Sequence, residues 1–445
     1  MARPKIVLPE EGISESDLLN EMEEIRKEDI NWRDGKVWSL VYHATDEHTE
    51  MLKKAYTMFF SKNALSPLAF PSLKKFETEV ISMAIDLFHG DKRCCGSMTS
   101  GGTESILMAV KTYRDWAKEK FPNVKEPEMV LPSSAHPAFE KGADYFKVKS
   151  IRIPVNKDTH LADVKLMEDA INKNTVLLVG SACDFPRGVV DPISNLGEVA
   201  KNYDIGLHVD ACLGGFMLPF VKKLGYEVPD FDFTVPGVTS ISADVHKYGY
   251  GAKGASTILY RKERIWKHQF SVYTNWSGGI YISPSMRGTR PGGAIAAAWA
   301  AMKHLGLDGY LNLAKVVMDA TKKLTEGINQ IPELYVIGKP IMSVFSFTSD
   351  KIDIYHLGDI LDKKGWHLDR IQFPNALHMM VNPHHAEIVD TFLNDLRNSV
   401  NELIENPKES TDGDAAIYGM VASLPDRDKV KDYIINFLKS QYKIK

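Results

Sequence analysis

The sequence has few of the features that mark a secreted, metal-binding or nucleic-acid-binding protein. Its 445 residues include four cysteines, Cys94, Cys95, Cys183 and Cys212, which form neither a disulfide framework nor a zinc-binding spacing. So few cysteines favour a reducing, cytosolic environment. The formal net charge of -4 comes without a long basic block. We therefore expect neither a bound metal ion nor a nucleic-acid partner.

Long apolar runs are also missing. Residues 1–22 contain no apolar core of signal-peptide length. No stretch reaches the roughly 18 apolar residues of a membrane-spanning helix. The most apolar stretch, GGAIAAAWAAMKHLGL at 292–307, is shorter and contains a lysine and a histidine, so it predicts a buried helix. We expect a soluble, cytoplasmic chain without a transmembrane segment.

Short strand-like runs alternate with longer amphipathic segments through the first two thirds of the chain. The runs are EMVLPSSA, SIRIPV, TVLLVGSA, GLHVDACL, SISADVH and STILYR. This alternation is typical of an α/β fold with a mainly parallel sheet and helices on both faces. After about residue 300, a helical pattern at 310–330 and the runs SVFSFTS and ALHMMVN predict a smaller α+β domain.

The expected organisation has three parts. They are an N-terminal segment at 1–62, a large domain at 63–305 and a small C-terminal domain at 306–445. The polar stretch NPKESTDGDA at 406–415 predicts a surface loop.

A pair of glycines precedes one of the expected helices. In TSGGTESILMAV, Gly101, Gly102 and Thr103 lie where the helix begins. Two glycines let the backbone approach an anion, and a helix N-terminus offers unpaired N–H groups and a positive dipole end. A phosphate group fits such a turn, although many Gly-Gly turns before helices are only turns.

Residues whose side chains can take part in chemistry follow three of the strand-like runs. Asp210 closes GLHVD, where it is either a helix cap or a carboxylate that holds a protonated ring nitrogen. Lys247 follows TSISA in SADVHKYGYG. It is either a loop lysine at the surface or an amine that desolvation keeps neutral and nucleophilic toward aldehydes. His246 is placed to donate to a phosphate, and His136 to stack on a cofactor ring.

The order of these motifs favours a pyridoxal-phosphate site. Ligands of parallel sheets bind beyond the carboxyl ends of the strands, so the glycine turn, the acidic strand end and the lysine are expected to meet there. Each motif alone has an ordinary structural explanation, but the combination predicts pyridoxal 5'-phosphate as the cofactor.

The same motifs resemble those of the sphingosine-1-phosphate lyases. The segments are TSGGTESILMA, SAH, HVDACLGGF, TSISADVHKYGYGAKG, GGIYISP and RPGG, followed by GWHLDRIQFPNALH and AIYGM. The resemblance covers the chain from about residue 30. DVHKYGYGAKG together with HVDACLGGF is more specific to these lyases than to the wider group II pyridoxal-dependent decarboxylases.

This resemblance implies a fold, a partner and several roles. It implies a fold-type-I homodimer with both active sites at the subunit interface, and a covalent link between the cofactor and Lys247. Asp210 would pair with the pyridinium nitrogen, and His136 would stack on the ring. The cofactor phosphate would contact Gly102, Thr103 and His246, together with the partner subunit's Thr289.

The implied reaction is a retro-aldol cleavage of the C2–C3 bond of a phosphorylated sphingoid base. The products would be phosphoethanolamine and a long-chain aldehyde. By resemblance, Tyr42, Lys253 and Asn63 would bind the substrate phosphate. The general base is left open between Lys247, once released, and Lys253.

Two positions depart from the lyase pattern. Ser66 closes Asn-Ala-Leu-Ser where the family usually has Asn-Pro-Leu-His, so phosphate affinity would fall or the preferred substrate would differ. Arg187, in DFPRG, replaces a common histidine, and we hypothesise that it restores the missing positive charge.

Two other functions remain as alternatives to the lyase function. An amino-acid decarboxylase on the same scaffold would share Lys247, Asp210 and His136 but would need a site for an α-carboxylate. A catalytically silent scaffold protein is disfavoured by the intact lysine, aspartate and glycine turn.

Overall fold

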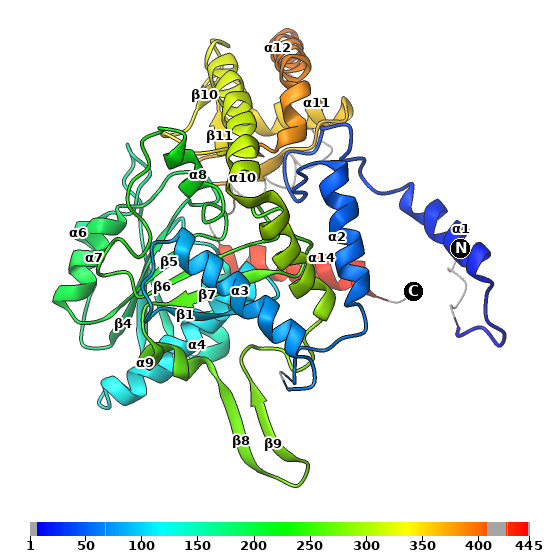
Figure 1. The fold of residues 1–445 in the computed structure, drawn as a ribbon. Coiled ribbons are helices and arrows are strands. Elements are labelled where there is room, and N and C mark those ends of the chain that lie inside the picture. The colour runs from blue at the N-terminus through cyan, green and yellow to red at the C-terminus, as the bar shows by residue number, and fades with distance from the viewer. Residues whose placement is uncertain (1–6, 67, 407–423, 425, 444–445) are drawn as a thin grey trace.

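The computed structural model describes residues 7–66, 68–406, 424 and 426–443. Most of these residues form two sheets with their covering helices, and an N-terminal helix lies apart from them (Figure 1). The predicted loop at 406–415, beyond its first residue, and the AIYGM segment lie outside the described residues.

The large domain is built on a seven-stranded sheet. The strand order is β1-β7-β6-β5-β4-β2-β3. β7 runs antiparallel to both of its neighbours, and the other pairs are parallel. The mainly parallel sheet predicted from the sequence is therefore confirmed, and it has seven strands. The strands are β1 (Cys95–Thr99), β2 (Glu128–Pro132), β3 (Lys149–Ile153), β4 (Thr175–Ser181), β5 (Gly206–Asp210), β6 (Ser240–Ala243) and β7 (Ser256–Tyr260).

Both faces of this sheet are buried. Successive side chains of a strand point to opposite faces. Val130 and Leu178 accordingly pack in one apolar core, whereas Met129, Leu177 and Val179 pack in a second core. Strands buried on both faces are nearly continuous apolar runs, which is why TVLLVGSA shows no polar alternation. The covering helices are α3 (Pro71–Leu87), α4 (Gly102–Lys120), α5 (Ala138–Phe146), α6 (Val164–Asp169), α7 (Ile193–Asn202), α8 (Leu218–Lys223) and α9 (Glu263–Trp266), with a 3-10 turn at Lys267–Gln269.

A second, antiparallel sheet forms the C-terminal part, as expected for a small α+β domain. Its strand order is β10-β11-β13-β12. The strands are β10 (Tyr335–Val336), β11 (Val344–Thr348), β12 (Asp369–Ile371) and β13 (Ala376–Met380). The helices of this part are α11 (Ile354–Lys363), α12 (Val389–Glu405) and α14 (Arg427–Tyr442), with a 3-10 turn at Pro383–Glu387.

One long helix joins the two parts. α10 (Gly292–Asn329) contains a break at Gly306, whose φ of 56° and ψ of -172° are not helical. Glycine adopts this conformation at little steric cost. The two halves correspond to the apolar helix expected at 292–307 and the helix expected at 310–330. The predicted domain boundary at residue 305 falls at this break, and the division into three domains stays a prediction.

The N-terminal segment is attached to the C-terminal sheet. The Trp38 N–H donates to the carbonyl of His367 (3.1 Å), and the Met380 N–H donates to the carbonyl of Trp38 (2.7 Å). α2 (Asp46–Met58) then packs along α10. The segment around Trp38 is therefore part of the C-terminal domain, although it lies near the N-terminus in the sequence.

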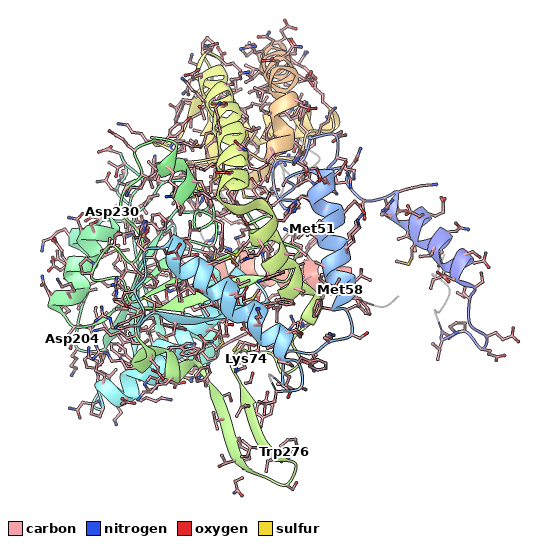
Figure 2. All side chains as sticks on the ribbon, viewed as in Figure 1. Met51, Met58, Lys74, Asp204, Asp230 and Trp276 are labelled. Carbon is pink, nitrogen blue, oxygen red and sulfur yellow. The ribbon has the colours of Figure 1, made fainter. Side chains whose placement is uncertain are left out.

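Two elements stand away from the body. α1 (Glu15–Arg26) has no buried residue, and the hairpin of β8 (Ser271–Trp276) and β9 (Gly279–Ser283) projects from the large domain (Figure 1). Trp276 lies near the tip of the hairpin, with 56% of its surface exposed (Figure 2). Both elements therefore present apolar side chains to their surroundings.

Several properties predicted from composition can be compared with the described residues. Among them no helix combines the length and apolar character needed to cross a bilayer, and no cluster of three or more His, Cys, Asp or Glu side chains is placed to hold a metal ion. All four cysteines are free thiols.

Candidate active site

A cavity of about 520 Å³ lies beyond the carboxyl ends of three parallel strands. Ser181 ends β4, Asp210 ends β5, and Asp244 directly follows β6, and all three line the cavity. This is the position that the rule for parallel sheets predicts. The structure brings nine of the predicted site residues to this cavity, namely Tyr42, Gly101, Gly102, Thr103, His136, Asp210, His246, Lys247 and Lys253.

The glycine turn at the start of α4 forms one side of the cavity. At Gly102, a β-carbon would lie 2.7 Å from Asp244 Oδ2 and 2.8 Å from Cys212 Sγ, so no larger residue fits there. Glu104 fixes the turn, since its Oε2 accepts the Ser100 N–H (2.6 Å) and its Oε1 accepts the Met286 N–H (2.9 Å). The turn is therefore rigid and presents backbone to the cavity, as an anion cradle requires.

Asp210 is held at the end of β5. Its Oδ1 accepts the Cys212 N–H (3.1 Å) and the Ser242 hydroxyl (3.3 Å). Oδ2 has no hydrogen-bond donor among the described residues. The carboxylate thus has one oxygen fixed by the protein and one available to a ring N–H, while it still caps the following turn. The capping role is confirmed, and the pairing with a ring nitrogen stays a prediction.

Two histidines of the cavity are held in defined orientations. The Ala138 N–H donates to His136 Nδ1 (3.1 Å), and the Ala255 N–H donates to His246 Nδ1 (3.1 Å). Burial lowers the pKa of both rings, to about 4 for His246. Both rings are therefore neutral near pH 7 and carry their proton on Nε2. A neutral His246 can donate this proton to a phosphate, and a neutral His136 can stack on a flat ring.

Lys247 is paired with a carboxylate that the sequence analysis did not select. Its Nζ lies 3.0 Å from Asp244 Oδ2, and the Asp244 side chain is 1% exposed. Burial favours the neutral amine and lowers the pKa of Lys247, but its neighbours, Asp244 first among them, together raise that pKa above its ordinary value. The expectation that desolvation keeps Lys247 neutral is therefore wrong for the protein without cofactor.

A second lysine and a tyrosine close the other side of the cavity. Lys253 Nζ donates to the Leu40 carbonyl (2.8 Å) and lies 5.0 Å from the centre of the Tyr42 ring. Burial, and then the charge of Lys247, lowers the pKa of Lys253 to about 8. The Tyr42 hydroxyl donates to Met380 Sδ (3.1 Å), and burial raises its pKa. Lys253 is thus a cation that loses its proton just above neutral pH.

Four predicted site residues do not line the cavity of their own chain. Asn63 Nδ2 donates to Thr289 Oγ1 (3.4 Å), and Asn63 Oδ1 accepts the Arg290 N–H (3.1 Å). Ser66 is exposed, and its Oγ accepts the Ala69 N–H (3.4 Å). Within one chain, Asn63, Ser66 and Thr289 therefore organise the turn before α3 and the segment before α10.

Arg187 is the fourth predicted site residue that does not line the cavity, and its contacts do not support a role in substrate binding. Its side chain is buried, its Nη2 donates to the Phe373 carbonyl (2.7 Å), and its Nη1 lies 3.7 Å from Asp184 Oδ2. The guanidinium joins the large domain to the C-terminal domain. Within one chain, the arginine does not supply the positive charge that Ser66 lacks.

We expect Arg187→Ala to lower the free energy of unfolding by about 2 kcal/mol, because it removes the buried hydrogen bond between the guanidinium and the Phe373 carbonyl. The Michaelis constant for a phosphorylated substrate should not change. Denaturant titration measures the first quantity and steady-state kinetics the second. Arg26→Ala, on exposed α1, is the control and should leave both unchanged. A large rise in the Michaelis constant with unchanged stability would instead support substrate binding by Arg187.

Sequence reasoning missed three acidic residues that line the cavity: Asp244, Glu104 and Asp369. Asp244 precedes Lys247 by three residues in DVHK, and its place at a strand end was a usable signal. Asp369 comes from β12 in the C-terminal sheet, and only the fold brings it to this edge of the large sheet.

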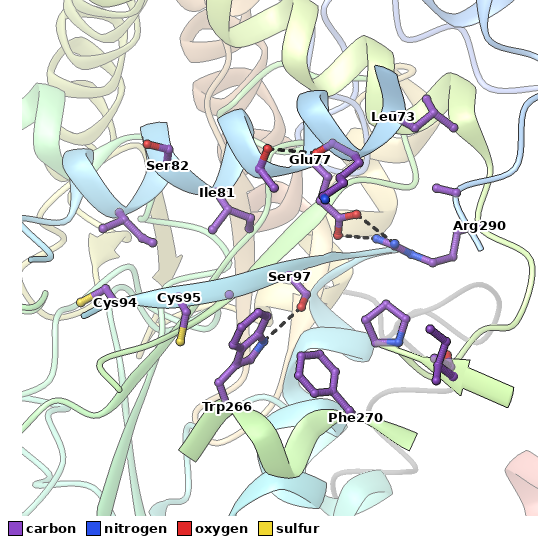
Figure 3. A pocket seen from close by; sticks show the side chains of 18 of the residues that line it. Leu73, Glu77, Ile81, Ser82, Cys94, Cys95, Ser97, Trp266, Phe270 and Arg290 are labelled. Atoms are coloured by element: carbon purple, nitrogen blue, oxygen red, sulfur yellow. Dashed lines mark hydrogen bonds and ion pairs between the residues drawn. The ribbon is translucent and has the colours of Figure 1, made fainter. Parts of the chain in front are cut away.

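A larger cavity, of about 690 Å³, lies between α3, β1 and the base of the hairpin (Figure 3). Its walls are mostly apolar, with Leu73, Ile81 and Phe270 among them, and the Glu77–Arg290 ion pair lies at its edge. None of the predicted site residues lines it. The candidate chemistry therefore belongs to the smaller cavity.

The chain is similar to known proteins over nearly its whole length. Residues 3–350 match the family model described as the pyridoxal-dependent decarboxylase conserved domain. The chain is 48% identical to the sphingosine-1-phosphate lyase of Oryza sativa subsp. japonica, over 97% of this chain and 81% of that protein. It is 44% identical to sphingosine-1-phosphate lyase 1 of Rattus norvegicus, over 98% of this chain and 77% of that protein.

Solved structures give the same comparison in three dimensions. The sphingosine-1-phosphate lyase of Burkholderia pseudomallei superposes with a TM-score of 0.91 at 38% identity, covering 99% of this chain and 98% of that one. A glutamate decarboxylase of Lactobacillus brevis superposes with a TM-score of 0.79 at 20% identity, covering 91% of this chain and 96% of that one. The second similarity shows the fold alone.

Proposed function

The chain belongs to the pyridoxal-dependent decarboxylase family and, within it, to the sphingosine-1-phosphate lyases, and from this premise we propose that it cleaves phosphorylated sphingoid bases between C2 and C3. Its cofactor is pyridoxal 5'-phosphate. The observation that carries the proposal is the meeting of Lys247, Asp210 and the rigid glycine turn in one cavity, with Lys253 and Tyr42 opposite.

The residues of the cavity fit this cofactor. Asp210 has an oxygen available for a ring N–H, His246 has an Nε2–H available for a phosphate, and Gly102 leaves only backbone at the start of α4. Lys247 offers an amine for the covalent link, and His136 a neutral ring for stacking. When bound, pyridoxal 5'-phosphate supplies an electron sink for the pair released as the C2–C3 bond breaks.

The protein's own groups would position the substrate and move its protons. We assign Lys253 and Tyr42 to the substrate phosphate and the atoms next to it, because both line the cavity and lie side by side. With a pKa near 8, Lys253 is partly neutral at physiological pH and is suited to take the proton of the C3 hydroxyl. Asp210, as a carboxylate, would keep the ring nitrogen protonated.

We also propose that two copies of the chain share their active sites. Asn63, Ser66 and Thr289 do not line the cavity of their own chain, and Thr289 is exposed. The apolar side chains of α1 and of the β8–β9 hairpin are exposed in the part of the chain that the structure describes. In a homodimer, these residues are available to the partner's cavity and these surfaces to the interface.

Incubation with sphingosine 1-phosphate and dihydrosphingosine 1-phosphate tests the reaction. We expect a long-chain aldehyde and phosphoethanolamine in equal amounts, measured by mass spectrometry after the aldehyde is trapped. Release of carbon dioxide from an amino acid, without an aldehyde from either lipid, would favour the decarboxylase alternative. A cofactor-loaded protein that yields neither set of products would favour the silent scaffold.

A further inference from the structure

We infer that Asp244 is a positioning residue that holds Lys247 as an ammonium ion whenever its amine is not covalently bound. The inference deepens the proposed function and rests on it for its role in turnover. Asp244 follows β6 directly, and Lys247 comes three residues later, so one turn of chain brings Nζ within 3.0 Å of Oδ2. The pair lies in the wall of the candidate active site.

The Asp244 carboxylate is buried, neither of its oxygens accepts a hydrogen bond from the described residues, and it has no cation other than Lys247. A β-carbon at Gly102 would meet both of its oxygens, at 2.7 and 3.0 Å, so the carboxylate lies against the glycine turn. Within the described residues, Lys247 is the only lysine or arginine in ion-pair range of Asp244. His246 Nε2 is 3.7 Å from the same oxygen, but burial keeps this ring neutral.

Other titratable groups around Lys247 do not replace this carboxylate. They come from the N-terminal segment, from the loops after β2, β4 and β5, and from the loop before β7, and they are Tyr42, His136, Cys183, Cys212 and Lys253. Burial raises the pKa of the phenol and of both thiols and lowers that of the imidazole, so these four are neutral near pH 7. Lys253 has the same sign as Lys247 and repels it.

The pair determines when the lysine reacts. An ammonium nitrogen has no lone pair, so Lys247 must lose a proton to solvent before its nitrogen adds to an aldehyde carbon. Without the carboxylate, burial alone would favour the neutral amine. Asp244 thus makes capture of an aldehyde dependent on pH, and it gives the lysine a defined resting place when a substrate amine takes over the covalent link.

Trace acetylation of the cofactor-free protein tests this inference. Acetic anhydride reacts only with neutral amines, and mass spectrometry of the peptide that carries Lys247 gives its acetylation rate at each pH. The exposed Lys157 serves as the internal reference. In the unmodified protein we expect the midpoint for Lys247 above that for Lys157. In Asp244→Asn we expect it to fall by more than one pH unit, with at least a tenfold faster reaction at pH 8.

Asp369→Asn is the matched control. It neutralises another carboxylate of the same cavity that makes no ion pair with Lys247, and it should leave the midpoint in place. Circular dichroism and thermal melting check the fold of each variant, and Asp244→Ser provides a second substitution. If the variants do not fold, a Lys247 midpoint at or below that of Lys157 in the unmodified protein overturns the inference.

A midpoint unchanged in folded Asp244→Asn overturns it equally. The labelling uses neither cofactor nor substrate, so its outcome is separate from that of the lyase assay. A protein without lyase activity can still show the shift, and an active lyase can lack it.

Discussion

Lys247→Ala is expected to abolish covalent capture of pyridoxal 5'-phosphate and to reduce aldehyde formation by at least about 10³-fold. The amine of Lys247 lies in the wall of the cavity that also contains the groups that would hold the ring and the phosphate. Alanine removes the nucleophile and leaves Asp244 buried without its cation. Absorbance of the loaded protein near the visible range, and its mass after borohydride reduction, measure the capture.

Lys253→Ala is the matched control for this experiment, because it removes a second lysine from the same cavity. It should keep the covalent adduct and its absorbance, and it should lose activity through weaker substrate binding or slower proton transfer. An adduct that persists in Lys247→Ala and disappears in Lys253→Ala would show that Lys253, and not Lys247, forms the covalent link to the cofactor. An adduct that depends on neither lysine would contradict the proposed site.

Asp210→Asn is expected to lower kcat by about 100-fold or more, with a smaller change in the Michaelis constant. An amide stabilises a protonated ring nitrogen far less than a carboxylate does, and each pKa unit of lost stabilisation is worth about 1.4 kcal/mol. The ring then withdraws electrons less strongly when the C2–C3 bond breaks. Because Asn is nearly isosteric, the hydrogen bonds to Cys212 and Ser242 can be kept.

Steady-state kinetics with dihydrosphingosine 1-phosphate, and the absorbance of the loaded variant, measure the effect of Asp210→Asn. Asp210→Glu keeps the charge and should recover part of the activity. Asp369→Asn, also in the cavity wall, should show no comparable change in the absorbance of the bound cofactor. A kcat within about threefold of the unmodified protein would remove Asp210 from its proposed role.

Much of the site was predictable because its residues lie at the ends of strands. An apolar run followed by Asp210, and another followed by Lys247, place both side chains at one edge of a parallel sheet without any knowledge of longer contacts. The glycine turn at Gly101 and Gly102 is local in the same sense, since it depends only on the start of α4. Asp210, Lys247 and the glycine turn lie around one cavity because β5, β6 and the start of α4 meet at this edge of the sheet.

Two expectations about the site failed, one through a contact between distant segments and one through a contact between near neighbours. Arg187 looked like a free cation near the site, but its guanidinium reaches the Phe373 carbonyl, 186 positions later in the chain. The protonation of Lys247 was misjudged because burial alone was weighed, whereas its neighbours, Asp244 first among them, together raise the pKa. Asp244 is only three residues from Lys247, so this contact could have been considered from the sequence.

The attachment of the N-terminal segment to the C-terminal sheet has a mechanical consequence. Trp38 is hydrogen-bonded to that sheet, Tyr42 bonds Met380 at its end, and the Leu40 carbonyl between them holds Lys253 of the large domain. This short stretch is a tether between the two halves of the protein. A rotation of the C-terminal sheet away from the large one would draw Tyr42 out of the cavity and release Lys253, so the cavity could not open without losing the wall that these two residues form.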